Sequence, residues 1–421
     1  MNKNSVNTFI KSDGERYCLL VSIETGIPLY YPNLYVTTQV RNRSLSYSSM
    51  ESTLSGISVL LSFMDEKEED LESRFKACNF FKEEELDAIR DYCQIKFNKR
   101  SVTKRTNGLF SLEELRIFDK KADIQTEYAR LSVIASYVKW LAETLSDGSR
   151  DKIVATNIEK MVKGLQARRP PKKSRNTNSK QEEKGLDSKQ LELVFEVFRP
   201  DSKLNPFKDE AIRRRNRLMF LVLFYLGLRG GELLNIRIRD INFSSNQLVV
   251  VRRADEKDDP RTYQPLVKTL DRRIPLKNTL AEQIHQYIIK DRKKVPNADK
   301  HDFLFVTHKS GPTQGQPISK SGYKKIFEVV RIACPGLYNL HGHTLRHTWN
   351  ERFSQLMDEM DNPPSEEKQE EMRSYLMGWK ADSGTAAIYN HRFVKNKSNE
   401  AALNLQKKMV RLPKELKNNG T

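Results

Sequence analysis

Residues 341–347 hold the densest group of chemically active side chains in this sequence. The chain has seven histidines, and three of them, at 341, 343 and 347, lie in this segment together with Arg346. Residues three and four positions apart meet on one side of a helix, so His343, Arg346 and His347 are expected to lie together. An arginine fork matches the oxygens of a phosphate or a carboxylate. The cluster therefore favours a bound anion.

Two aromatic residues follow this cluster, Trp379 after a glycine and Tyr389 after an alanine-rich run. Positive neighbours favour phenolate over phenol, so a tyrosine beside such a cluster could act as a nucleophile. Considered alone, Tyr389 is one of fifteen tyrosines, and Trp379 is by default a core aromatic.

Two further cations precede the cluster. Arg229 lies in a glycine-flanked break between two helical patterns, where the backbone can approach a ligand closely, although a structural ion pair with Glu232 is the simpler alternative. Lys268 lies in a polar excursion just before a strand, and Lys257 lies in the same excursion. Lysines in such connections are most often solvated.

Metal binding is not expected from this sequence. The pair His343-x-x-x-His347 lacks the glutamate directly after the first histidine that a zinc-protease helix requires. The four cysteines are scattered and form no Cys-x-x-Cys pair, which is typical of free thiols in a reducing cytoplasm. We therefore expect no metal site from these residues.

The length and charge of the chain indicate two domains and a polyanionic partner. A chain of 421 residues exceeds the usual size of one domain, and its net charge is +18. Such an excess indicates nucleic acid or an anionic membrane. The longest apolar run, 218–226, is too short to cross a bilayer, so nucleic acid is the better interpretation.

The first 166 residues predict a small β-rich module followed by a helical bundle. We expect a hairpin from strands at 17–23 and 34–40, and then a helix opened by a capping box at Ser48 and Glu51. Apolar periodicity predicts three more helices. These are expected at 83–97, 123–145 and 153–165.

A basic linker is expected between this bundle and the rest of the chain. Residues 160–180 contain eight lysines and arginines and no acidic residue, and they include a Pro-Pro pair. The segment could be a solvated hinge, but in a basic protein we favour a strap along a phosphate backbone. With the loop after the second helix, it supplies the predicted DNA-binding residues. These are Lys99, Arg100, Lys104, Arg105, Arg168, Arg169, Lys172, Lys173 and Arg175.

The second half predicts a mainly helical domain with a small antiparallel sheet, so the whole chain is expected to be mainly α (α+β). Strands are expected at 247–253 and 273–276, and an acidic, proline-containing insertion at 358–371. Helices are expected at 188–198, 210–226, 278–293, 319–333, 343–360 and 398–409.

The order of these motifs resembles that of the tyrosine recombinases, the phage integrase family. The resemblance covers about 186–409 and rests on three short motifs. They are Gly-Leu-Arg229-x-x-Glu232-Leu, His343-x-Leu-Arg346-His347, and Leu-x-Gly-Trp379 followed by Tyr389-x-His. The resemblance implies a core-binding domain at 46–166 after a module at 1–45, a linker at 167–185, a catalytic domain at 186–412 and a tail at 413–421.

The resemblance also implies a reaction. Arg229 and Arg346 would hold the phosphate oxygens, Trp379 would donate its indole N–H, and Tyr389 would attack phosphorus to give a 3′-phosphotyrosyl link. His343 would assist proton movement, and Lys268 rather than Lys257 would protonate the leaving 5′ oxygen. Glu232 would brace Arg229, and His347 would orient its neighbours. Neither ATP nor a metal would be needed.

The partners implied are double-stranded DNA carrying specific recombination sites, three further copies of the chain, and accessory proteins, without a membrane. Such a protein is expected in the bacterial cytoplasm at the nucleoid, encoded by a mobile element. Two alternatives remain open: a DNA-binding relative without catalysis, and a type IB topoisomerase or telomere resolvase with similar tyrosine chemistry.

Overall fold

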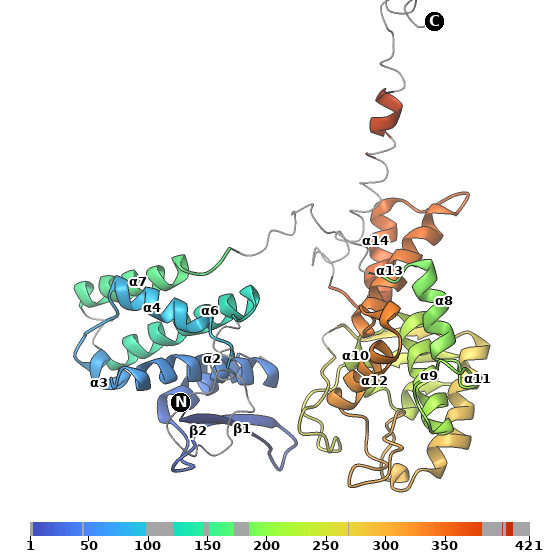
Figure 1. The fold of residues 1–421 in the computed structure, drawn as a ribbon, viewed down its shortest axis with the longest axis horizontal. Coiled ribbons are helices and arrows are strands. Elements are labelled where there is room, and N and C mark those ends of the chain that lie inside the picture. The colour runs from blue at the N-terminus through green and yellow to red at the C-terminus, as the bar shows by residue number, and fades with distance from the viewer. Residues whose placement is uncertain are drawn as a thin grey trace, which may run out of the picture. The chain divides into compact units, whose positions relative to one another are not determined.

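The computed structural model describes residues 3–43, 46–97, 121–146, 151–171, 185–267, 269–380, 398 and 401–406. The chain divides into two compact units between Lys180 and Gln181. Both are largely helical, and each contains one small antiparallel sheet (Figure 1). The expected mainly α fold with little β structure is confirmed, whereas the finer domain bounds stay predictions.

The first unit packs a hairpin and several helices around one hydrophobic core. The longest helices, α2 and α6, contact each other, and α7 packs on α6. Its elements are β1 (Asn4–Ile10), β2 (Arg16–Ser22), α1 (Tyr30–Tyr35), α2 (Tyr47–Glu66), α3 (Leu71–Lys76), α4 (Glu83–Cys93), α6 (Ile124–Leu145) and α7 (Lys152–Ala167).

Two local predictions in this unit are wrong. Strand β2 pairs with β1, whereas residues 34–40 are helical, because α1 continues as a π-helical segment, Val36–Arg41. The Asn33 side chain accepts the N–H of Leu20 at 2.8 Å and donates to its carbonyl at 2.9 Å, so the other edge of β2 is occupied by an amide. Helix α2 begins at Tyr47 with Ser46 as N-cap, so Ser48 lies inside the helix.

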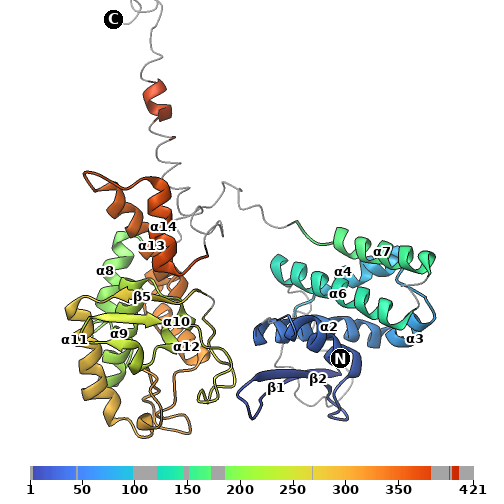
Figure 2. The same ribbon diagram turned by 180° about the vertical axis from the view of Figure 1, so that it is seen from behind.

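The second unit places its small sheet on one side of a group of helices, as the front and back views show (Figure 1 and Figure 2). The strands pair in the order β3-β4-β5. The elements are α8 (Ser188–Val197), α9 (Glu210–Leu226), α10 (Gly230–Asn235), β3 (Ile241–Asn242), β4 (Gln247–Val250), β5 (Arg272–Pro275), α11 (Asn278–Gln286), α12 (Lys320–Ala333), α13 (Gly342–Asp358) and α14 (Glu366–Met377).

Helix α9 is the central element of this unit. Its last nine residues, 218–226, are buried except Tyr225, and α13, α11 and α10 all contact it. Gly227 ends the helix with φ +61°, and a β-carbon there would come within 2.7 Å of Met377 and 2.9 Å of Trp349. Only glycine adopts this conformation readily and leaves that space. The chain therefore turns immediately before Arg229.

The polar excursion between β4 and β5 is folded back by buried ion pairs. Arg261 pairs with Asp259 at 2.7 Å and donates to the carbonyls of Leu234 and Ile318.

The acidic insertion is only partly a loop, because residues 366–371 form the first turns of α14, capped by Ser365. Residues 398 and 401–406 are helical, within the helix expected at 398–409.

No helix within the described ranges is long and apolar enough to cross a membrane.

Candidate active site

The carboxylate of Glu232 lies at the centre of the cationic residues in the second unit. It is on α10, its side chain is fully buried, and it pairs with Arg272 of β5 at 2.9 Å. It also accepts from the Thr269 hydroxyl at 2.5 Å and from the backbone N–H of Arg229 at 2.9 Å. Burial raises the pKa of Glu232, but Arg272, Arg346 and Thr269 outweigh it, so the pKa lies below the ordinary value.

Two guanidinium groups from distant parts of the chain approach this carboxylate. Arg229 Nη1 lies 3.9 Å from one carboxylate oxygen of Glu232, and Arg346 Nη1 lies 3.9 Å from the other. The sequence prediction paired Glu232 with Arg229 alone. The structure shows instead that Glu232 makes its shortest ion pair with Arg272 and lies between all three arginines.

Arg346 is 1% exposed and is held by main-chain carbonyls. It donates to Gly227 O at 2.7 Å and to Met377 O at 3.0 Å, which are the residues at the ends of α9 and α14. Its guanidinium carbon lies 5.5 Å from the centre of the Trp379 ring. Trp379 is itself buried beside Met377. The structure thus brings Arg346, Arg229 and Trp379 to one place.

The two histidines of α13 also meet. The rings of His343 and His347 lie 4.3 Å apart in an edge-to-face arrangement. His343 is exposed and lies in the first turn of α13, whose N-cap is His341. His341 accepts the N–H of Thr344 through Nδ1 at 3.1 Å. An exposed imidazole therefore lies at the positive end of a 17-residue helix, one turn before Arg346.

The proposed acid and nucleophile, Lys268 and Tyr389, lie outside the described residues. The neighbours of Lys268 are nevertheless fixed to this site. Thr269 bonds Glu232, the Leu270 N–H donates to Gly378 O at 3.0 Å, and Leu266 O lies 2.6 Å from where a β-carbon on Gly231 would be. Lys257, by contrast, is an exposed residue of the folded-back excursion.

The predicted DNA-binding residues are described at only two positions. Arg168 is paired with Asp87 at 2.7 Å and with Glu83 at 2.8 Å, so its guanidinium ties α7 to α4. Arg169 lies over the ring of Tyr128. The others fall outside the described residues, and these are Lys99, Arg100, Lys104, Arg105, Lys172, Lys173 and Arg175.

Sequence reasoning missed Arg272, although the sequence contains a signal for it. Arg272 and Arg273 are consecutive on β5, so they must point to opposite faces, and Arg272 shares a face with the buried Ile274. A buried arginine requires a carboxylate partner, and Glu232 provides one.

Comparison with known proteins places the chain in a family. The model of the phage integrase family matches residues 186–396, half of the chain, and the chain belongs to this family. The tyrosine recombinase XerD of Halalkalibacterium halodurans is 24% identical over 209 residues, which cover 48% of this chain and 58% of the relative. A XerC-like tyrosine recombinase of Caldanaerobacter subterraneus is 26% identical over 233 residues, covering 51% and 55%. The chain thus spans about half the length of the curated relatives it matches.

Solved structures with some likeness include the Tn1549 transposon integrase in complex with circular intermediate DNA. Its TM-score is 0.40 at 17% identity, covering 65% of this chain and 77% of that chain. The XerA recombinase gives a TM-score of 0.34 at 16% identity, covering 91% and 98%.

Glu232→Gln should lower the free energy of unfolding by about 3 to 5 kcal/mol at neutral pH, because it leaves buried guanidinium groups without their counter-charge. Urea unfolding followed by circular dichroism measures this. Because the folded-state pKa is lowered, the contribution is present above the unfolded pKa of about 4.3 and is lost as the pH falls through the folded value. The difference between the two proteins should therefore shrink in acid.

The control is Glu282→Gln, on the exposed face of α11, which should change stability by less than about 0.5 kcal/mol. Equal losses in the two variants, or a difference that does not vary with pH, would contradict this role of Glu232.

Proposed function

We propose that this chain is a site-specific DNA recombinase that cleaves and rejoins DNA strands through a 3′-phosphotyrosyl intermediate. The observation that carries the proposal is the convergence of Arg229 and Arg346 on the two oxygens of the Glu232 carboxylate. Membership of the phage integrase family supports it, because the family match runs past Tyr389. The net charge of +18 suits a DNA substrate.

Each residue has a role in that reaction. A phosphodiester under attack carries charge on its non-bridging oxygens. Arg229 and Arg346 stabilise that charge, and Trp379 contributes its indole N–H. The Tyr389 oxygen forms a bond to phosphorus as the bond from phosphorus to the 5′ oxygen breaks. The phenolic proton leaves with the help of His343, and Lys268 gives a proton to the departing oxygen.

The reaction is reversible without an external energy source. The phosphotyrosyl link is itself a phosphodiester, so the energy of the broken DNA bond is retained. The 5′ hydroxyl of a second strand can therefore attack the phosphorus and release Tyr389. That exchange is the chemical basis of recombination, and four copies on two duplexes perform it. We assign the chain to a bacterial mobile element, acting in the cytoplasm at the nucleoid with accessory proteins. The basic linker lies along the DNA backbone in this proposal.

A covalent adduct tests the nucleophile. The full chain, incubated with a nicked duplex carrying the recombination site of its element, should form a protein–DNA adduct that survives denaturing electrophoresis. Tyr389→Phe should abolish the adduct, because phenylalanine has no oxygen to attack phosphorus. Tyr375→Phe is the matched control, since Tyr375 is an exposed tyrosine of α14.

An adduct that persists in Tyr389→Phe would reject this nucleophile. Tight binding of the site by a chain that forms no adduct would instead indicate a DNA-binding relative without catalysis. Relaxation of supercoiled plasmids that lack the site would indicate a topoisomerase.

The choice between Lys268 and Lys257 as the acid can be tested with a sulfur-containing substrate. Lys268→Ala should slow cleavage by about 10² to 10⁴-fold, the usual contribution of a general acid. A bridging sulfur at the leaving position should restore the rate, because a thiol with a pKa of about 8.5 departs without a proton. Lys257→Ala should cleave both substrates normally. Loss of rate on both substrates with Lys268→Ala would show a role other than proton donation.

The helix around residues 398–409 is assigned to contacts between copies of the chain. A chain ending at Val394 should bind one site with unchanged affinity but fail to form the four-copy complex, which mass photometry can detect. A chain ending at residue 412 serves as the control and should assemble normally. Assembly by the shorter chain would show that the helix packs within its own copy.

A further inference from the structure

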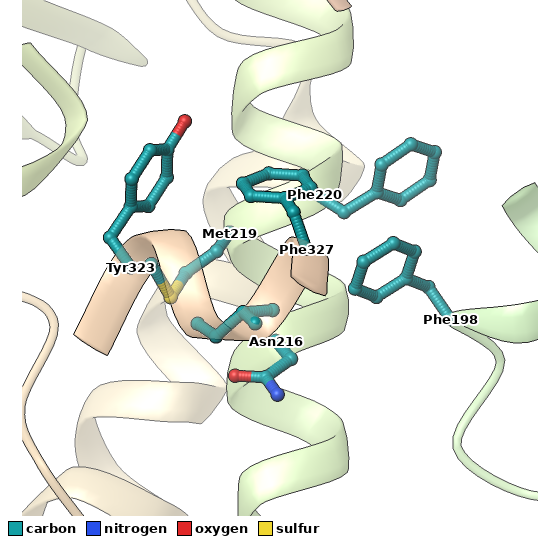
Figure 3. Close-up of a pocket in the computed structure, with 7 residues that line it drawn as sticks. Phe198, Asn216, Met219, Phe220, Tyr323 and Phe327 are labelled. Carbon is teal, nitrogen blue, oxygen red and sulfur yellow. The ribbon is translucent and has the colours of Figure 1, made fainter. Parts of the chain in front are cut away.

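Tyr323, on α12, has a buried hydroxyl that is unexplained by the roles given above. Its ring packs edge-to-face on Phe327 with the centroids 5.1 Å apart, beside a small hollow between α9 and α12. Figure 3 shows the ring at the edge of this apolar group, with its oxygen pointing away from Asn216 and the phenylalanines. The ring is thus held by apolar contacts, and its hydroxyl points away from them.

The hydroxyl points to the start of α13. A β-carbon built on Gly342, the first residue of that helix, would lie 1.8 Å from Tyr323 Oη. One built on Gly230, next to Arg229, would lie 2.9 Å from the same atom. The phenol is therefore accommodated only because both positions are glycine. It lies where the chain segments carrying Arg229 and His343 come together.

No hydrogen-bond partner for this hydroxyl exists among the residues that the structure describes, although the oxygen is shielded from solvent. Buried polar groups are nearly always satisfied, and exceptions often mark binding or catalytic sites. Burial raises the pKa of Tyr323, so the group stays protonated and can donate. It meets the N-terminus of a 17-residue helix, which also favours a negative charge.

We propose that Tyr323 and the N-terminus of α13 form a phosphate subsite in which the Tyr323 hydroxyl donates to a non-bridging oxygen of the DNA backbone. The subsite rests on the proposed function, because Arg229 and His343 beside it belong to the recombination site. Binding requires the two helix starts to part enough to admit that oxygen. The hydroxyl then gains a partner that the described residues do not supply.

The test uses the full chain and inorganic phosphate, exchanged for chloride at constant ionic strength. Thermal stabilisation by phosphate yields its affinity. Tyr323→Phe should weaken that affinity at least about tenfold, as expected for a lost hydrogen bond to a charged group. Without phosphate it should melt no lower than the natural chain, because only a hydroxyl without a partner is removed. Tyr338→Phe, at an exposed tyrosine, is the matched control and should bind phosphate normally.

Equal phosphate affinity in Tyr323→Phe and the natural chain would overturn the subsite, as would the absence of saturable phosphate binding by the natural chain. Phosphate should also displace a labelled short duplex less effectively from Tyr323→Phe than from the natural chain. Displacement that does not depend on Tyr323 would show that the subsite takes free phosphate and not DNA, which would also overturn the proposal.

A second pair of variants tests the geometry independently. Gly342→Ala should destabilise the chain, because its methyl group would overlap the phenolic oxygen. In the double variant with Tyr323→Phe the nearest remaining ring atom lies 3.0 Å away, so part of the lost stability should return. Gly322→Ala, whose β-carbon would meet nothing closer than 3.4 Å, is the control. No recovery in the double variant would contradict the position of the hydroxyl.

These outcomes are separable from those of the recombinase proposal. Phosphate binding that depends on Tyr323 in a chain that forms no DNA adduct would support the subsite and reject the recombinase. A DNA adduct formed by a chain whose phosphate affinity does not depend on Tyr323 would support the recombinase and reject the subsite.

Discussion

Three arginines around one buried carboxylate are the constraint on which the second unit depends. Among the described residues of this cluster, Arg229, Arg272 and Arg346 bring three positive charges, and Glu232 brings one negative charge. Main-chain carbonyls at 227 and 377 orient Arg346 without neutralising it. An excess of positive charge is costly away from water, and an anion reduces that cost. Glu232 therefore stabilises the cluster, and the positive charge that remains suits the phosphodiester of the proposed reaction.

Glycines at chain reversals allow this arrangement. Gly227 ends α9 and Gly378 ends α14, both with positive φ, and each lies against side chains that a β-carbon would strike. The reversals direct the carbonyls of Gly227 and Met377 to Arg346. They also place Arg229 two residues after Gly227, and Trp379 directly after Gly378. Rigid helices therefore hold the site although several of its residues lie in connections.

The sequence predicted most of the longer helices of both units, because each has an apolar stripe and a clear end, whereas α1, α3 and α14 were not predicted. Helix 210–226 agrees at both ends, since Asp209 caps its start and Gly227 ends it. Residues 34–40 were misassigned because valines and threonines suit a strand, whereas Thr37 and Thr38 bond back to carbonyls four residues earlier in a helix. The edge of β2 away from β1 is instead occupied by the Asn33 side chain and the main chain of residues 27–29, which are contacts that the local sequence pattern does not contain.

The site was predictable only in part, because some of its contacts join segments that are far apart in the chain. Arg229, His343 and Arg346 stood out as motifs, but the sharing of Glu232 with Arg272, and the contact of Tyr323 with two glycines, arise from segments far apart in the chain. Spacing identifies groups on one helix, whereas the charge balance of a buried cluster appears only when separate elements are packed together.

The attachment of α14 to β5 fixes the end of α14 that precedes Trp379. Arg272 donates to the carbonyl of Leu376 at 2.7 Å, and the Leu270 N–H donates to Gly378 O, so the end of α14 is fixed from the sheet. The loop at 359–365 enters α14 at the opposite end of that helix. A longer or shorter loop at 359–365 should therefore leave the position of Trp379 unchanged. This loop is a suitable place to insert a fluorescent reporter or an affinity tag.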